Sequence, residues 1–133
     1  MSVAYYIVPE REIEGFDHFV NGKALGHADE DTLNHLCEEL SVQSILSFIS
    51  QDPEELADFM EDEGIEMPAE LPETRWFDAT VGLATVRALA VHLENNPDAL
   101  KDASNLVEDL REYENVLERF EQEKVRWYLG LDF

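Results

Sequence analysis

The sequence predicts an α+β fold, in which a small sheet contains the N- and C-terminal strands and about five helices cover it. Residues 3–8 (VAYYIV) are β-branched or aromatic except for one alanine, and Pro9 closes them, which is typical of a strand. Residues 125–133 (VRWYLGLDF) alternate with the period of a strand. The residues between these ends repeat at helical spacing. We therefore expect residues 1–133 to form a single acidic domain with paired terminal strands.

The first strand is apolar on both faces, which favours a position inside the sheet rather than at its edge. A weaker third strand is expected over residues 16–20, because the Asn21-Gly22 pair that follows is a common hairpin turn. Residues 23–25 would then return as its short partner.

Three short helical segments are expected in the first half of the chain. The first has apolar residues at 33, 36, 37 and 40, behind an aspartate cap at 29 or 31. The second is an apolar cluster over residues 45–49, which the side chain of Ser41 could cap. The third begins at Pro53 and ends at Gly64. Residues 61–73 contain two prolines and many acids, and they are expected to form a surface loop.

Two longer helices are expected in the second half. Asp78 begins the more apolar one, which extends to residues 95–96 and should lie at the centre of the core. Pro97 and Asp98 begin the last helix, whose apolar residues recur at three and four through residue 120. This apolar stripe could be a coiled-coil seam, but packing on the core is favoured because the sheet needs to be covered. A monomer or a homodimer is compatible with the sequence, and the dimer would be favoured by an exposed row at Leu106, Leu110 and Leu117.

Residues 24–74 form an acidic window, with fifteen of the 31 acidic residues and no lysine or arginine. The window carries −15 of the formal net charge of −22, and the remainder of the chain carries −7. This charge argues against nucleic acid and anionic membranes as partners, and it admits basic proteins or cations.

Several general features lead us to expect a cytoplasmic protein. The chain has no apolar run of about 18 residues, so no transmembrane helix is expected. Residues 1–8 lack the basic start and the long apolar run of a signal peptide. The single cysteine excludes an internal disulfide, which fits a reducing compartment.

Catalytic residues, metal sites and cofactors are not expected. His27, Asp29, Asp31 and His35 are close in sequence, but Asp31 and His35 make only one pair on a helix face, and EF-hand spacing is missing. Cys37 belongs to an apolar stripe, so a buried thiol is favoured over a nucleophile. Neither a Gly-x-Ser-x-Gly elbow nor a glycine-rich phosphate loop occurs.

The acidic window has three interpretations: a solvated face, a docking surface for a basic protein, or an adaptation to high salt. A solvated face is the simplest. Docking, in the manner of nuclease inhibitors, toxin-immunity proteins or DNA mimics, is the best functional hypothesis. Adaptation to salt fits less well, since seven of the nine basic residues lie in the second half. The candidate partner-binding residues are Glu61, Asp62, Glu63, Glu66, Arg75 and Trp76.

Two aromatic residues follow the acidic loop in the segment Arg75-Trp76-Phe77-Asp78. They could form a hydrophobic staple that enters the core while Asp78 caps the next helix. Alternatively, they could form an aromatic anchor with an arginine at a binding surface.

The alternative to a docking protein is a small-molecule-binding domain or a small enzyme. Its pocket would lie where the sheet meets residues 61–75, near Tyr5, His18, Arg75 and Trp76.

Three distinctive segments together span nearly the whole chain: residues 19–25 (FVNGKAL), 76–89 (WFDATVGLATVRAL) and 125–133 (VRWYLGLDF). They resemble those of a group of small, uncharacterised bacterial proteins. The resemblance implies a bacterial cytoplasmic protein. It supplies no activity, and no functional residue is carried over from it.

Overall fold

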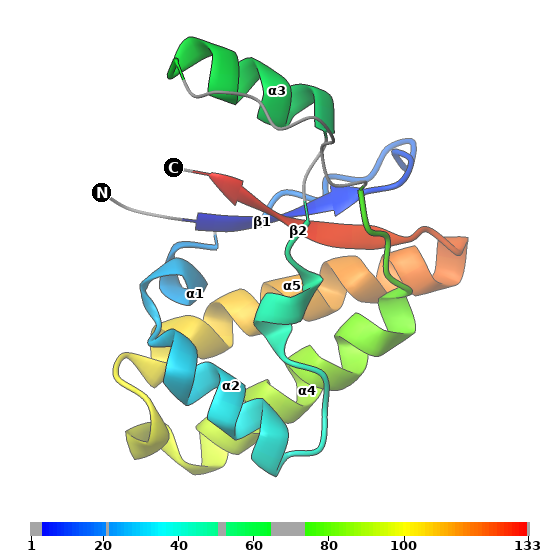
Figure 1. The fold of residues 1–133 in the computed structure, drawn as a ribbon. Coiled ribbons are helices and arrows are strands. Elements are labelled where there is room, and N and C mark those ends of the chain that lie inside the picture. The colour runs from blue at the N-terminus through cyan, green and yellow to red at the C-terminus, as the bar shows by residue number, and fades with distance from the viewer. Residues whose placement is uncertain (1–3, 21, 51–52, 65–73, 133) are drawn as a thin grey trace.

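The computed structural model describes residues 4–20, 22–50, 53–64 and 74–132 (Figure 1). It confirms the predicted α+β fold, with the two terminal strands paired and five α-helices in these ranges. None of the described helices is both long and apolar enough to cross a membrane. In chain order the elements are β1 (Ala4–Pro9), α1 (Lys23–His27), α2 (Glu30–Glu39), the 3₁₀ turn η1 (Ile45–Phe48), α3 (Pro53–Asp62), α4 (Ala79–Asn95), the 3₁₀ turn η2 (Pro97–Ala99), α5 (Ala103–Glu123) and β2 (Trp127–Asp132).

The sheet has two antiparallel strands, with a register that runs from Ala4 opposite Asp132 to Pro9 opposite Trp127. The expectation that the first strand lies inside a larger sheet is therefore wrong. Its second face is apolar for another reason: Tyr6 lies opposite Gly130, and its ring fills the space that a side chain at position 130 would occupy. An aromatic ring over a glycine in this way shields the backbone of the neighbouring strand.

Short bridges cover the second edge of β2. Phe77 and Trp127 exchange backbone hydrogen bonds of 2.9 and 3.0 Å, and the Ser50 N–H donates to the Leu129 carbonyl at 3.0 Å. On the free side of β1, the Tyr5 N–H donates to the Gly22 carbonyl at 3.3 Å. These contacts pair backbone groups that an open edge would expose.

The predicted third strand and its return partner are wrong. Residues 16–20 have no regular structure, and Lys23–His27 is the helix α1. The Asp17 carboxylate accepts the Phe19 N–H at 2.9 Å, so a local side-chain bond replaces the bond to a strand partner. After residue 22 the chain turns helical, as the hydrogen bond of 3.1 Å from the Gly26 N–H to the Gly22 carbonyl shows.

The core lies between the sheet and the helices α1, α2, α4 and α5, which are on one side of it in Figure 1. Helix α3 lies on the other side of the sheet. The Trp127 ring is 1% exposed and packs at 4.9 Å from Phe48, which is fully buried. Gly82 of α4 is a requirement of this packing, because a side chain there would overlap the Trp127 ring.

The last helix begins later than the sequence predicts. Pro97–Ala99 is a separate 3₁₀ turn, and α5 begins at Ala103. Leu100 between them is extended and buried, which anchors the link in the core and interrupts the helix. Packing of the apolar stripe on the core is confirmed. The row tested for a dimer seam is buried inside the molecule, with Leu106, Leu110 and Leu117 at most 1% exposed.

Helix caps agree with the predictions in part. Asp29 caps α2 by accepting the Thr32 N–H at 3.0 Å. The cluster at residues 45–49 forms the 3₁₀ turn η1, and Ser44 caps it instead of Ser41. Asp78 precedes α4, but its side chain makes no capping bond; its carbonyl accepts the Trp127 indole N–H at 3.2 Å.

Gly64 follows the end of α3, as predicted. It has a positive φ of 68°, and its N–H donates to the Glu61 carbonyl at 3.1 Å. The predicted loop over residues 61–73 starts later, because Glu61 and Asp62 belong to α3. The remainder of that loop, residues 65–73, lies outside the described residues.

Candidate functional site

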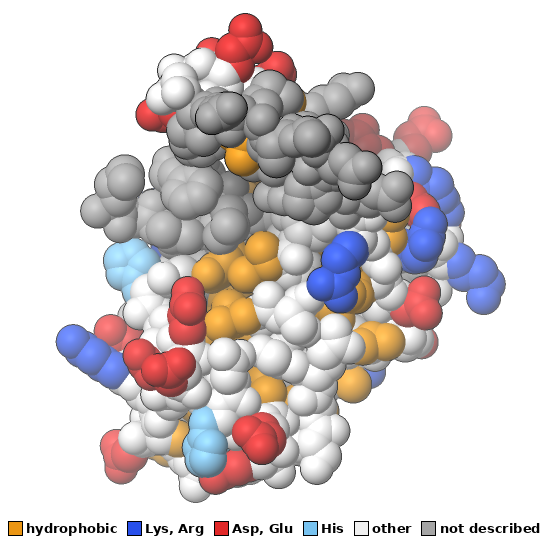
Figure 2. Space-filling view, in the orientation of Figure 1, with side chains coloured by type: hydrophobic (Ala, Val, Ile, Leu, Met, Phe, Trp, Pro, Cys, Tyr) orange, Lys and Arg blue, Asp and Glu red, His pale blue; other side chains and the backbone are white. Residues whose placement is uncertain are grey.

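The predicted acidic contact residues lie at the end of α3. Glu61 and Asp62 form its last turn and Glu63 follows directly, and all three are exposed. Figure 2 shows acidic side chains projecting from this part of the molecule. Glu66 lies outside the described residues. The three described acids therefore form one exposed negative cluster, on the opposite side of the sheet from α4 and α5.

Arg75 and Trp76 lie beside β2 and the segment that follows η1. The Arg75 N–H donates to the Ser50 hydroxyl at 2.8 Å, and its guanidinium lies 5.2 Å from the Phe77 ring centre. The Trp76 ring packs 5.1 Å from the Tyr128 ring but remains partly exposed. The packing expected of a staple is present, since Phe77 packs on Phe48 and Trp76 on Tyr128, but Asp78 makes no capping bond. The role of Arg75 and Trp76 at a binding surface stays a prediction.

Four of the described arginines form ion pairs, all with acids outside the acidic window. Arg87 contacts Glu114 at 2.9 Å and Glu118 at 2.7 Å, and Arg111 contacts Glu114 at 3.0 Å. Burial alone would raise the pKa of Glu114, but hydrogen bonds from Arg111 and Arg87 outweigh it and lower that pKa. The other pairs within the described part are Arg111–Glu94, Arg119–Glu123 and Arg126–Glu10.

The acids of the window have a different environment. None of the described arginine ion pairs includes an acid of this window. Glu39 lies 3.0 Å from the His35 imidazole, and Asp29 is used as a helix cap. Hydrogen bonds from the Thr32 side chain and backbone lower the pKa of Asp29, so this carboxylate stays charged. The described arginine ion pairs therefore leave the charge of these acids uncompensated.

Metal and thiol chemistry find no support in the described residues. No group of three or more histidine, cysteine, aspartate or glutamate side chains in these ranges is placed to hold a metal ion. Cys37 is 1% exposed, and burial raises the pKa of its thiol. A buried, protonated thiol is a poor nucleophile, in agreement with its predicted place in the core.

The residues of the alternative pocket have separate environments. Tyr5 is buried in the core, and the His18 ring packs 6.5 Å from the Phe120 ring. His18 also lines a cavity of about 670 Å³ formed by residues 12–18 alone. Arg75 and Trp76 line neither this cavity nor the second one described below.

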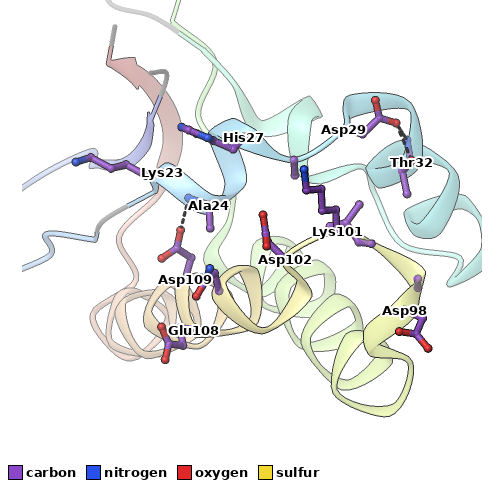
Figure 3. Close-up of a pocket in the computed structure, with 14 residues that line it drawn as sticks. Lys23, Ala24, His27, Asp29, Thr32, Asp98, Lys101, Asp102, Glu108 and Asp109 are labelled. Carbon is purple, nitrogen blue, oxygen red and sulfur yellow. Dashed lines mark hydrogen bonds between the residues drawn. The ribbon is translucent and has the colours of Figure 1, made fainter. Parts of the chain in front are cut away.

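The second cavity, of about 770 Å³, is a hollow where α1, the start of α2, η2 and the start of α5 meet (Figure 3). On its α5 side, the Asp109 carboxylate accepts the Ala24 N–H at 3.0 Å and so fixes the start of α1. Asp109 is only 8% exposed. Burial raises its pKa, hydrogen bonds from Ala24 and Leu25 oppose this, and the nearby charges of Glu112 and Glu108 raise it further.

The hollow does not follow from the sequence, because its walls are far apart along the chain: Ala24 and Asp109 are separated by 85 residues. One feature of the sequence does indicate a buried polar contact here. Asp109 is three residues from Leu106 and four from Tyr113, so it occupies the apolar stripe of α5. A carboxylate in such a stripe needs a buried partner.

Comparisons with models of protein families, with curated proteins and with solved structures find no match to this chain. The resemblance of three segments to small bacterial proteins stays a prediction. The function is accordingly inferred from the distribution of charge and from the hollow.

Proposed function

We propose that this is a non-enzymatic cytoplasmic protein of bacterial type whose acidic face docks a basic partner protein. The observation that supports the proposal is the separation of charge. The described arginine ion pairs use acids outside residues 24–74, whereas the described acids inside that window have no such pair.

The end of α3 is the part of this face that we propose to make contact. Glu61, Asp62 and Glu63 are consecutive and exposed, so a basic surface could approach them without breaking an ion pair in the described structure. A surface of one sign attracts a partner of the opposite sign and raises the association rate, an effect that salt weakens.

Arg75 and Trp76 add a different kind of contact. Trp76 is held against Tyr128, so its exposed side could be buried by a partner with little loss of side-chain freedom. Tryptophan and arginine are also the residue types that most often contribute strongly at protein interfaces. In this proposal the acids steer the partner and Trp76 retains it.

The test is affinity capture from the source cell with the full chain, at low and at high salt. Wild-type protein should enrich a basic protein at low salt and lose it at high salt, because screening lengths fall from about 10 Å at 0.1 M to about 3 Å at 1 M. The triple variant E61Q/D62N/E63Q should capture that protein at least about tenfold less well.

A matched control removes the same number of charges elsewhere. The variant E14Q/E112Q/E121Q changes three exposed acids that make no ion pair with another described residue. It should keep most of the captured partner. If both triple variants lose the partner equally, the site at α3 is wrong; if the wild type enriches no basic protein at low salt, docking itself is wrong.

A further inference from the structure

The hollow between α1 and α5 has the size of a small-molecule site. Its volume of about 770 Å³ lies within the range of about 300–1,000 Å³ that such sites occupy. Three separate stretches of chain form its walls: residues 23–32, 98–102 and 105–109. Ala24, Ala28 and Leu100 supply apolar surface in it. A short apolar group therefore has something to pack against inside an otherwise polar cavity.

Two adjacent side chains of opposite charge reach into the hollow without a partner in the described part of the chain. In Figure 3, Lys101 and Asp102, which lie directly before α5, point toward α1, while Glu108 and Asp98 point away. Neither Lys101 nor Asp102 makes a side-chain hydrogen bond or ion pair with another described residue.

The other carboxylates that line the hollow near these two already accept hydrogen bonds from the protein backbone. Asp109 holds the Ala24 N–H and Asp29 caps α2 through Thr32. The backbone of Asp102 is left-handed, with a φ of 57°, a conformation uncommon in residues other than glycine, asparagine and aspartate. The turn at Asp102 places two successive charged side chains on one wall of the cavity.

We propose that this hollow binds a small zwitterion, namely an amino acid with a short apolar side chain. The Lys101 ammonium would bind the ligand's carboxylate, and the Asp102 carboxylate would bind the ligand's ammonium. The methyl groups of Ala24 and Ala28 would contact its side chain. Ligands with one charge would satisfy only one of the two groups, and a dianion would meet the excess of carboxylates around the cavity. This proposal is independent of the docking proposal.

The test is an NMR titration of the full, isotope-labelled chain with L-alanine, L-valine and L-leucine, and with propylamine and propionate as singly charged probes. At least one amino acid should cause saturable shifts confined to the amides of residues 23–32 and 98–109, and should bind about tenfold more tightly than either singly charged probe. If no amino acid gives saturable shifts up to about 10 mM, which corresponds to a binding free energy of about −2.7 kcal/mol, the proposal is wrong.

Two variants and two controls identify the groups that bind. K101M and D102N should each weaken binding about tenfold, and asparagine suits the left-handed backbone at position 102, so the fold should be kept. E121Q and K124M make the same kinds of change at exposed residues that do not line the hollow, and they should leave binding unchanged. Equal loss in variants and controls, or equal binding by propylamine alone, would overturn the assignment of a zwitterion.

Discussion

Asp109 shows how one side chain connects distant parts of the chain. Its carboxylate accepts the Ala24 N–H at 3.0 Å while it is almost fully buried. The bond stabilises the start of α1, but burial and the neighbouring Glu112 and Glu108 disfavour the charge. The neutral form of the same acceptor would keep the hydrogen bond without the cost of burying a charge.

Replacing Asp109 by asparagine should therefore change stability in a way that depends on pH. The pKa of Asp109 is raised in the folded state, so folding favours its protonated form; its contribution is most favourable below its unfolded pKa of about 3.8 and is lost as pH rises through the folded pKa. The free energy of unfolding of D109N, relative to wild type, should be higher at pH 7 than at pH 3.5. Urea denaturation at both values measures it.

The alanine variant separates the charge from the hydrogen bond. D109A removes the acceptor and leaves the Ala24 N–H without its partner, so it should be less stable than D109N by about 1–3 kcal/mol at both pH values. If D109N is as unstable as D109A at pH 7, or if the difference between D109N and wild type does not change with pH, the burial of an unfavourable charge is not what Asp109 contributes.

At the scale of elements, β1, the entry to α1 and α5 meet at one close contact. The Tyr113 hydroxyl of α5 donates to the Tyr5 carbonyl at 2.7 Å, and the Tyr5 N–H donates to the Gly22 carbonyl. Tyr113 is 1% exposed, and burial raises the pKa of its hydroxyl, which therefore remains a donor. A side chain at position 22 would overlap both the Tyr5 carbonyl and the Tyr113 hydroxyl.

The variant G22A should lower the free energy of unfolding by about 3 kcal/mol, at the upper end for overpacked sites, because the added methyl forces these elements apart. Gly15 is the matched control. It has a positive φ of 74° but open space around it, so G15A should cost only about 1 kcal/mol of backbone strain. Urea denaturation of both variants checks the order, and an equal loss would mean that the contact at Gly22 is not tight.

Elements with a local signal were predictable, and those set by distant contacts were not. The first strand follows from its β-branched and aromatic composition, and the last strand and the stripe of α5 follow from periodicity. The hairpin expected at Asn21-Gly22 did not form, because Gly22 is held between Tyr5 and Tyr113, which are far away in sequence. The start of α5 was misplaced because Leu100 is extended and buried, which Pro97 and Asp98 do not indicate.

At the scale of the molecule, the candidate sites divide in the same way. The acidic window could be read directly from the sequence, because a run without lysine or arginine needs no fold to be seen. The structure adds that the ion pairs of the described arginines include no acid of this window. The hollow could not be predicted, since it requires α1, η2 and α5 to converge.

A net charge of −22 on 133 residues should make stability depend on salt. Like charges four residues apart, such as Asp58 with Asp62 on α3 and Glu108 with Glu112 on α5, each cost about 0.2–0.5 kcal/mol. Because salt screens such repulsion, raising NaCl from about 0.1 M to 1 M should increase the free energy of unfolding by on the order of 1–2 kcal/mol. The gain should be smaller in E61Q/D62N/E63Q, which starts with less repulsion. Thermal unfolding across the salt series measures how the stability of the wild type and of the triple variant changes with salt. A wild type that is equally or less stable at 1 M NaCl would show that its few ion pairs, rather than its unpaired acids, dominate its electrostatics.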